Sequence, residues 1–333
     1  MDRPCTGPNW PISLWTVIEL STSLSAAGAR RRARLNNALA AAPPHAYFAV
    51  SAVFHYLGPS FAVLLFARVA VLGVAWLRIV SAAIIFAAWR RPWRAFRVLD
   101  RDGRFLLLAW GSVLALMNAC FYLAISRLPL GTVAAIEFLP VIALAALGAR
   151  SRRNLAALVA VVAGVYLLTD VRLADAPIGF VFAFANAVLF SFYIVLADRV
   201  AKRPHLSGID GLGSAMLIAA VVITPLGGWQ AGPALVDPIA LLAGIGVGVS
   251  SSVIPYVTDQ LAMERLARAT YALMVALLPA IATVIGVIVL TQIPTWIEIA
   301  GVGLVIAGVA VHEPSALDVT KDRGSERSAC KSR

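Results

Sequence analysis

Charged residues are scarce in this sequence. Asp, Glu, Lys and Arg make up only 14% of the 333 residues, whereas soluble domains contain about 25%. Hydrophobic residues reach 60%, and the mean hydropathy is +0.85. The composition therefore excludes an ordinary soluble domain and indicates a multi-pass membrane protein.

Cysteine and histidine are also rare. Cys5, Cys120 and Cys330 are far apart and have no CxxC or Cys/His spacing, so the sequence predicts neither a disulfide framework nor a metal site. The four histidines are scattered along the chain. No Walker sequence or other nucleotide-binding motif occurs, so ATP is not the expected energy source and no cofactor is expected.

Acidic residues are outnumbered, and the net charge of +11 would suit a protein that binds nucleic acid. The positions of the basic residues argue against that function. If the N-terminus is inside, the cytoplasmic segments hold nearly all of the 28 Lys and Arg residues, and the opposite segments hold only Arg68, Arg127 and Arg172. This asymmetry follows the positive-inside rule and predicts that both termini are cytoplasmic. Such basic loops would also meet anionic lipid.

The hydrophobic residues form about ten runs, and a helix needs about 20 apolar residues to cross a membrane. The predicted spans are residues 46–66, 70–89, 105–125, 131–148, 154–169, 178–197, 212–227, 238–257, 269–290 and 296–311. The predicted fold class is therefore an all-α polytopic membrane protein with about ten transmembrane helices. Residues 1–44 are expected to form a disordered or interfacial N-terminal tail, and residues 313–333 a disordered cytoplasmic tail.

The two halves of the apolar region resemble each other in short segments that occur in the same order. The matched pairs are Ser60-Phe61 with Ser191-Phe192, Arg68-Val69-Ala70 with Arg199-Val200-Ala201, Leu123-Ala124 with Leu261-Ala262, Arg127-Leu128 with Arg265-Leu266, and Val162-Ala163-Gly164-Val165 with Ile306-Ala307-Gly308-Val309. Each half, residues 45–169 and 177–312, holds about five helices. Since an odd number of helices inserts the halves in opposite orientations, the sequence predicts two inverted five-helix repeats, as in many alternating-access transporters.

The charged residues Glu137 and Arg78 lie deep inside predicted spans. An ionised carboxylate in hydrocarbon costs at least ~2.5 kcal/mol on insertion scales, so such residues usually face a pathway or a partner. Glu137 is either a proton-carrying or amine-binding carboxylate, or one half of a static ion pair with Arg78. Arg78 in turn would bind a substrate carboxylate, or hold Glu137 or helix-end carbonyls.

Polar residues on other helices share the predicted depth of these two charges. At 1.5 Å per residue, Glu137, Arg78, Asn118 and Asn186 all fall roughly 9 to 14 Å from the outer surface, which predicts a central polar cavity. Asn118 and Asn186 would be either ligands or interhelical hydrogen-bonding residues.

Further candidates lie near this level or at the cytoplasmic mouth. Phe121, Tyr122 and Tyr193 would line the path or pack the core, and His55 would relay protons or pack. At the mouth, Asp259 with Arg265 would form a gate or belong to a solvated loop.

Two prolines and two glycines have expected effects on the backbone. Pro140 and Pro279 would break their helices and free a carbonyl four residues earlier, which is tolerated where a helix lines a cavity. Gly244 and Gly248 have the GxxxG spacing that lets helices approach closely.

Several short motifs have a recognisable pattern. They are Trp76-Leu77-Arg78, Pro92-Trp93-Arg94, Met117-Asn118, Phe121-Tyr122-Leu123, Pro129-Leu130-Gly131, Ile136-Glu137-Phe138, and Pro255-Tyr256 with Asp259. At these residues the chain resembles the EamA-domain branch of the drug/metabolite transporter superfamily, and more narrowly its bacterial threonine/homoserine exporters. The resemblance covers roughly residues 46–311. It implies ten helices in the bacterial inner membrane, a central path between the halves, and efflux of amino acids or other small metabolites. Similar exporters have a glutamate just before the ninth-helix proline, where this chain has Leu278.

Three functions are compatible with these features. We expect a secondary transporter that exports a small metabolite, an amino acid of the threonine/homoserine type, by proton antiport with alternating access. A multidrug or cationic-compound efflux transporter of the same fold is the alternative. An intramembrane enzyme would need a Ser/His couple or a His/Asp cluster at one depth. The expected partners are a small-molecule substrate, protons and membrane lipid, without nucleic acid, and nothing in the sequence specifies an oligomeric state.

Overall fold

The computed structural model describes residues 43–90, 92–93, 99–140, 151–172, 176–201, 203, 208–265, 274–275 and 277–311. Within these residues every regular element is a helix. Most of the predicted N-terminal tail, and all of the predicted tail at 313–333, lie outside the described residues.

The helices include two π-helical segments, which are labelled η. In chain order they are α2 (Pro44–Leu65), α3 (Val71–Arg90), α5 (Arg101–Ile125), α6 (Leu130–Glu137), α8 (Arg152–Arg172), α9 (Pro177–Ala201), α10 (Gly208–Ile223), η1 (Thr224–Gly228), α11 (Gly232–Val236), α12 (Pro238–Gly248), η2 (Val249–Val253), α13 (Ile254–Arg265), α15 (Leu278–Leu290) and α16 (Trp296–Val311). Each of the ten predicted spans contains a described helix. The apolar runs become helices because lipid cannot satisfy an exposed backbone N–H or C=O group.

The lengths of the helices confirm an all-α polytopic membrane protein with about ten helices. Six described segments are long and apolar enough to cross a membrane, and α15 and α16 are shorter apolar helices. The main difference from the predicted spans is in the fourth and ninth. α6 ends at Glu137, and α15 begins only at Leu278, so the helix does not run unbroken through either span in the described residues.

Side-chain caps fix several helix ends. Asp100 caps α5 by accepting a hydrogen bond from the backbone N–H of Gly103 at 2.9 Å, and Asp237 caps α12 in the same way. At the start of α16, Thr295 and Glu298 form a capping box, in which each side chain accepts from the backbone N–H of the other.

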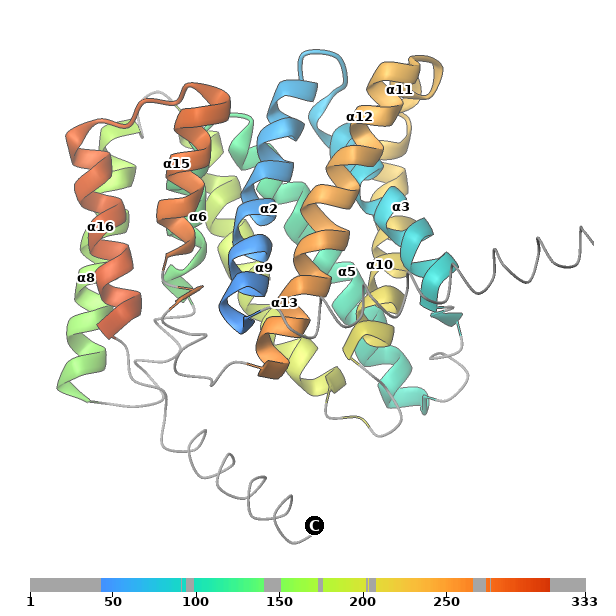
Figure 1. Ribbon diagram of the computed structural model, residues 1–333, viewed down its shortest axis with the longest axis horizontal. Helices are drawn as coiled ribbons and strands as arrows, with labels where there is room; N and C mark the ends of the chain where they lie inside the picture. The colour runs from blue at the N-terminus through green and yellow to red at the C-terminus, as the bar shows by residue number, and fades with distance from the viewer. Residues whose placement is uncertain are drawn as a thin grey trace, which may run out of the picture. The chain divides into compact units, whose positions relative to one another are not determined.

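Corresponding helices of the two halves pack against each other. α8 lies beside α16 and α6 beside α15 (Figure 1), and α3 packs on α10. Since α3 corresponds to α10 and α5 corresponds to α12, the contact between α3 and α12 is the counterpart of the contact between α5 and α10. Two inverted repeats related by a two-fold axis produce such reciprocal pairing.

The contact between α8 and α16 shows this reciprocity at single residues. A Cβ atom on Gly164 would meet Gly301 and Val305, whereas one on Gly308 would meet Ala157 and Val161. When Gly164 is aligned with Gly308, Ala157 aligns with Gly301 and Val161 with Val305. The two segments that resemble each other in sequence therefore face each other in the structure.

Many large apolar side chains remain on the outside of the helices. Phe105 is 74% exposed, and Val221 and Ile288 are each 73% exposed. In a soluble protein such side chains would be buried, but apolar side chains on a surface that faces hydrocarbon are already in an apolar environment. Small and polar side chains are found instead inside the bundle, where the candidate site lies.

Candidate functional site

Arg78 of α3 is buried, with 5% exposure, and is held mainly by η2. Its Nε donates to the hydroxyl of Ser252, and its Nη2 donates to the carbonyl oxygen of Ser251, each at 3.0 Å. The Cζ atom of Arg78 lies 5.4 Å from the ring centroid of Tyr122 on α5, which is a cation–π distance. Neutral groups on two other elements therefore stabilise the buried cation.

The local sequence explains why the carbonyl of Ser251 can accept this bond. In an α-helix it would accept from the N–H of residue 255, but Pro255 has no N–H. The backbone forms the π-helix η2 at this point, and Arg78 supplies the donor that the proline lacks. Single turns of π-helix are frequent at functional sites. The carbonyl of Pro255 is itself bonded, because Ser51 of α2 donates to it at 3.1 Å.

Glycines allow the backbone of this region to approach α2 and α3. A Cβ on Gly248 would lie 2.8 Å from the carbonyl oxygen of Arg78, and one on Gly58 would overlap Ser251. A Cβ on Gly244 would lie 2.7 Å from a methyl carbon of Leu77 on α3. The GxxxG spacing is therefore a packing contact, as expected. It brings α12 and η2 close enough for Arg78 to reach a main-chain carbonyl.

Glu137 is the last residue of α6 and makes an interhelical hydrogen bond. The Nδ2 of Asn186 on α9 donates to its Oε1 at 3.2 Å. Asn186 is fully buried and its Oδ1 has no hydrogen-bond partner among the described residues, whereas Glu137 retains 8% exposure. A side-chain amide can donate to a carboxylate and, after rotation by 180°, accept from a carboxylic acid. Asn186 is therefore a suitable partner for Glu137 in either protonation state.

The static ion pair between Arg78 and Glu137, one of the two interpretations of the sequence, is absent from the described residues. Each side chain instead bonds to neutral partners, Arg78 to the serines of η2 and Glu137 to Asn186. The expectation that Arg78 holds a backbone carbonyl is correct, but the carbonyl belongs to η2 rather than to a helix end. The two opposite charges are still close enough to interact electrostatically.

Tyrosine hydroxyls lie around these two charged groups. Tyr56 of α2 is 1% exposed and within electrostatic reach of Glu137, and Tyr256 of α13 is within reach of both Glu137 and Arg78. Tyr122 is fully buried, and its hydroxyl lies beside Arg78 but has no hydrogen-bond partner within the described ranges. The sequence offered Tyr122 as a residue that would line the path or pack the core, whereas Tyr256 was not among the candidate site residues. The signal for Tyr256 was the helix-breaking proline directly before it.

Asn118 differs from its expected role. Its Nδ2 donates to the carbonyl oxygen of Leu114 at 2.8 Å, one turn earlier in the same helix. Within the part of the chain that the structure describes, this amide group bonds along α5 rather than to another helix.

The remaining aromatic candidates make packing contacts. Phe121 lies beside Tyr122, with ring centroids 6.0 Å apart. Tyr193 stacks on Phe190 at 6.3 Å and lies 5.7 Å from the ring of Trp110. Tyr193 is also within electrostatic reach of Tyr256, so it borders the cluster from α9.

His55 lies on α2 beside Tyr56, with the two rings in an edge-on arrangement and their centroids 5.2 Å apart. Its charge would interact with that of Arg78. His55 precedes Ser60 by five residues, as Asn186 precedes Ser191, and the two serines are matched in the repeat. Equivalent positions of the two halves thus contribute His55 and Asn186 to the same polar cluster.

The two prolines lie at the helix breaks. α6 ends three residues before Pro140, and the turn at Phe138 closes with a 3.3 Å bond to the carbonyl of Ala135. Pro279 is in the first turn of α15 rather than in a helix interior, a position that proline favours because the N–H there needs no intrahelical acceptor. α6 and α15, which pack together, are therefore both interrupted near the level of Glu137.

The candidate cytoplasmic gate is described only in part. Asp259 is half-buried near the C-terminal end of α13 and within electrostatic reach of Tyr193. The side chain of Arg265 lies outside the described residues, so the pairing of Asp259 with Arg265 stays a prediction.

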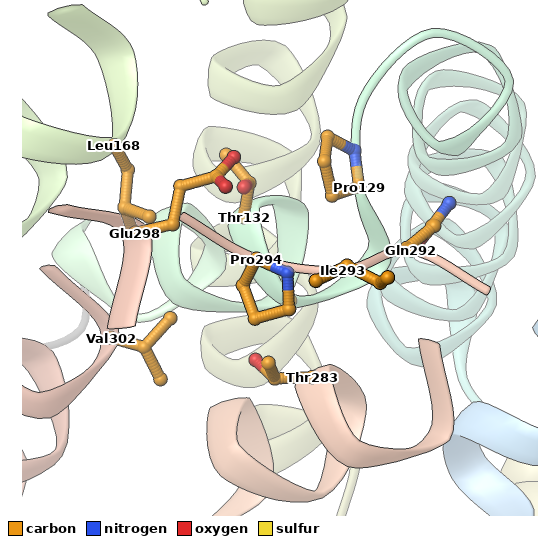
Figure 2. Close-up of a pocket in the computed structure, with 10 residues that line it drawn as sticks. Pro129, Thr132, Leu168, Thr283, Gln292, Ile293, Pro294, Glu298 and Val302 are labelled. Atoms are coloured by element: carbon orange, nitrogen blue, oxygen red, sulfur yellow. The ribbon is translucent and has the colours of Figure 1, made fainter. Parts of the chain in front are cut away.

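A second polar region, which sequence reasoning did not select, lies between α6, α8 and the start of α16. Figure 2 shows Glu298 beside Thr132, with Gln292 and Thr283 also lining a cavity of about 20 Å³, room for about one water molecule. Glu298 is 3% exposed, and one of its oxygens accepts from the backbone N–H of Thr295 at 2.7 Å. The spacing Thr-x-x-Glu was the available signal, and it indicates a capping role rather than a ligand site.

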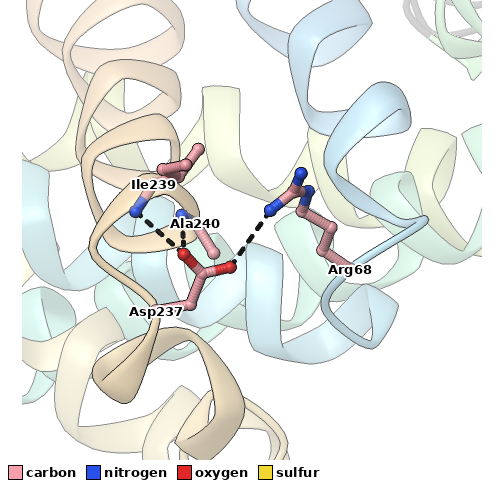
Figure 3. Close-up of polar contacts among 4 residues, drawn as sticks. All are labelled: Arg68, Asp237, Ile239 and Ala240. Atoms are coloured by element: carbon pink, nitrogen blue, oxygen red, sulfur yellow. Dashed lines mark hydrogen bonds and ion pairs between the residues drawn. The ribbon is translucent and has the colours of Figure 1, made fainter.

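An ion pair outside the spans joins the α2–α3 loop to α12. The Nη1 of Arg68 lies 3.3 Å from the Oδ2 of Asp237, whose Oδ1 accepts from the N–H groups of Ile239 and Ala240 (Figure 3). These donors, the Ala240 N–H foremost, hold the pKa of Asp237 below its ordinary value. Exposed pairs of this kind contribute little to stability by themselves.

No group of three or more His, Cys, Asp or Glu side chains that could hold a metal ion occurs among the described residues. The chemistry that the cluster offers is therefore that of one carboxylate, one guanidinium and the hydroxyl and amide groups around them.

Comparison with known proteins agrees with this arrangement. Residues 177–312 match the EamA-like transporter family. The threonine/homoserine exporter RhtA of Escherichia coli (strain K12) is 33% identical over 254 residues, which cover 75% of this chain and 84% of that protein. The threonine/homoserine exporter RhtA of Salmonella typhimurium (strain LT2) has the same identity and coverage.

A solved crystal structure of another protein shares the fold. It superposes with a TM-score of 0.52 over 80% of this chain and 96% of that chain, at 18% sequence identity. The identity to the two exporters extends over most of both chains. The chain is therefore a member of the EamA-like transporter family, related to its threonine/homoserine exporters.

Proposed function

We propose that this protein is a secondary transporter that exports a small amino acid of the threonine/homoserine class across the bacterial inner membrane in exchange for protons. Its relatives are named as threonine/homoserine exporters. Membership of a transporter family favours transport over an intramembrane enzyme. The observation that carries the mechanism is the Glu137–Asn186 pair, buried beside Arg78 at the break of α6.

Glu137 would bind the proton and the substrate ammonium in alternation. It has the exposure and the single neutral partner that such a role requires, since a carboxylate locked to an arginine would be neither protonated nor displaced easily. Its position at the C-terminal end of α6 also favours the approach of a cation. Competition between proton and ammonium for one carboxylate is the simplest basis for antiport.

Arg78 would bind the substrate carboxylate. Its guanidinium is now bonded to a serine hydroxyl and a carbonyl, both neutral, so its positive charge is not compensated by a directly bonded anion. A carboxylate could replace the hydroxyl of Ser252 and form a charge-assisted bond, which is roughly twice as strong as a neutral one. An amino acid carries both groups that this pair of residues can recognise.

Alternating access would arise from movement of the two repeats, residues 45–169 and 177–312, against each other. Arg78 and Glu137 are 5% and 8% exposed, so the arrangement resembles an occluded state that must open to either side. The breaks in α6 and α15 and the π-helix η2 are the places where the backbone has fewest internal hydrogen bonds to lose. The basic loops support an orientation with both termini in the cytoplasm.

The second candidate is efflux of larger cationic compounds by the same fold. The tyrosines around the cluster and Leu278, in the place of a family glutamate, favour it because they make the site more aromatic and less acidic. Aromatic faces attract organic cations.

Transport by purified protein in proteoliposomes tests the proposal. With an imposed pH gradient, labelled threonine or homoserine should move against its own gradient, and a proton ionophore should abolish this movement. Movement of a cationic dye but not of threonine would establish the second candidate instead. If neither compound responds to the pH gradient, the proposal of proton-coupled amino-acid export is wrong.

A further inference from the structure

A groove between α5 and α9 lies outside the site described above. It has a volume of about 570 Å³ and is lined at one end by Arg101, Arg199 and Arg203, and at the other by Phe105 and Leu196, among others. We propose that this groove binds an anionic glycerophospholipid, with the phosphate among the arginines and an acyl chain along the apolar wall.

The helical spacing separates a charged end from an apolar end on each helix. On α5, Arg101 and Phe105 are four residues apart and therefore lie on one face. On α9, Leu196 and Arg199 are three residues apart and share a face in the same way. Because α5 begins where α9 ends, the two arginine ends meet and the two apolar ends meet. The groove thus changes from basic to apolar along the helix axes, as a membrane does from headgroups to acyl chains.

The charges of the groove leave room for an anion. Arg203 is paired with Asp100 at 3.2 Å, and Asp102 adds one further carboxylate to the lining. Arg101 and Arg199 make no ion pair or hydrogen bond with any residue of the described ranges. A cation at the first position of a helix opposes the helix dipole, so Arg101 is poorly placed to stabilise α5 itself.

The apolar wall identifies the anion as a lipid rather than a soluble phosphate. Phe105 is 74% exposed, and Leu106 and Leu196 line the groove beside it. A soluble anion would gain nothing from these side chains, whereas an acyl chain covers them. Basic pockets between transmembrane helices on the cytoplasmic side bind acidic lipid headgroups in other membrane proteins.

The test measures lipid binding to the full chain in detergent by native mass spectrometry, with phosphatidylglycerol as the probe. The key variant is Arg199→Gln, and the matched control is Arg152→Gln on α8, which removes one exposed arginine elsewhere. Loss of one basic contact should weaken phosphatidylglycerol binding about fivefold, and the control should not. Thermal melting without lipid verifies that both variants are folded.

Three outcomes would overturn the assignment. They are equal phosphatidylglycerol binding by the two variants, equal binding of the zwitterionic phosphatidylcholine by the unaltered protein, and full competition by inorganic phosphate, which would make the groove a soluble-anion site. The readout is binding, so the result does not depend on which substrate the protein transports.

Discussion

At the scale of single residues, the partners of the two buried charges matter more than the charges themselves. A direct ion pair between Arg78 and Glu137 would neutralise both and leave neither available to a substrate. In the structure, serines and a carbonyl hold the cation, and one amide holds the carboxylate. Breaking a buried ion pair costs about 3–5 kcal/mol, whereas exchanging neutral hydrogen bonds costs far less. Neutral partners therefore keep both charges exchangeable.

Asn186 should be required for coupling because it is the direct partner of Glu137. The change Asn186→Ala removes a hydrogen bond to a charged group, worth about 1.5–3 kcal/mol, so the rate of pH-driven threonine transport should fall by about tenfold or more. Asn118→Ala is the control, since the Nδ2 group of Asn118 donates to a carbonyl of its own helix. Equal rates in the two variants would show that the Glu137–Asn186 bond has no role in transport.

Part of the cluster could be predicted, but the pairing of its residues could not. The cost of burying charge pointed to Arg78 and Glu137, and shared depth pointed to Asn186. Depth does not specify the rotation of a helix about its axis, so the sequence could not show that Glu137 faces Asn186 rather than Arg78. The amide of Asn118 turned out to bond within its own helix for the same reason.

At the scale of elements, the π-helix η2 is the feature that sequence reasoning missed. Gly248 and the consecutive serines after it were present in the sequence, but a π-helix depends on tertiary contacts as well as on the missing N–H of Pro255. Arg78 approaches from α3, far away in the chain, and makes the wider turn favourable. The breaks at Pro140 and Pro279, by contrast, follow from proline chemistry alone and were predicted.

Restoring the missing N–H should separate stability from transport. In Pro255→Ala the new N–H can bond to the carbonyl of Ser251 and favours a regular α-helix, which competes with Arg78 for that acceptor. We expect a melting temperature equal to or above that of the unaltered protein, together with a several-fold loss of threonine transport. Unchanged transport would show that η2 is not part of the substrate site. Pro238→Ala, at the first position of α12, is the control for loss of a proline.

The cap of α12 gives a pH-dependent prediction. The pKa of Asp237 is lower in the folded state than its ordinary value, so its charged form stabilises the protein above the ordinary pKa, and this contribution disappears as the pH falls through the folded-state pKa. Asp237→Asn should therefore lower the melting temperature slightly and by a constant amount between about pH 5 and pH 8. The difference should begin to shrink only below about pH 4 and should disappear below the folded-state pKa.

Asp237→Ala extends this comparison because it removes the cap as well as the ion pair with Arg68, whereas asparagine can still cap the helix. The alanine variant should therefore melt below the asparagine variant at neutral pH. If the difference in melting temperature between the unaltered protein and Asp237→Asn grew towards acidic pH, it would contradict the assigned direction of the Asp237 pKa.

At the scale of the whole molecule, the helical character of the apolar spans was the most predictable feature. The short matches in sequence aligned Gly164 with Gly308, and the structure shows reciprocal contacts between their helices. The positions of the described helices along the chain followed from hydropathy. The lengths of α6 and α15 could not be predicted from hydropathy, because hydropathy measures composition and does not detect a break in a helix.

The proposed orientation can be tested with single cysteines. In a variant whose native cysteines are replaced by serine, Arg127→Cys in the α5–α6 loop should react with a membrane-impermeant maleimide in intact cells. Arg152→Cys at the start of α8 should react only after the membrane is permeabilised. The positive-inside rule requires this pattern, and the reverse labelling would invert the assigned direction of transport.

The central claim is that Glu137 carries the proton that drives export, and proteoliposomes with an imposed pH gradient test it most directly. Glu137→Gln should abolish pH-driven threonine movement, because glutamine cannot ionise. Glu298→Gln is the matched control: it changes another buried glutamate, and glutamine preserves a capping box, so transport should be kept. If Glu137→Gln retains full coupling to the pH gradient, the proton is carried elsewhere and the account is wrong.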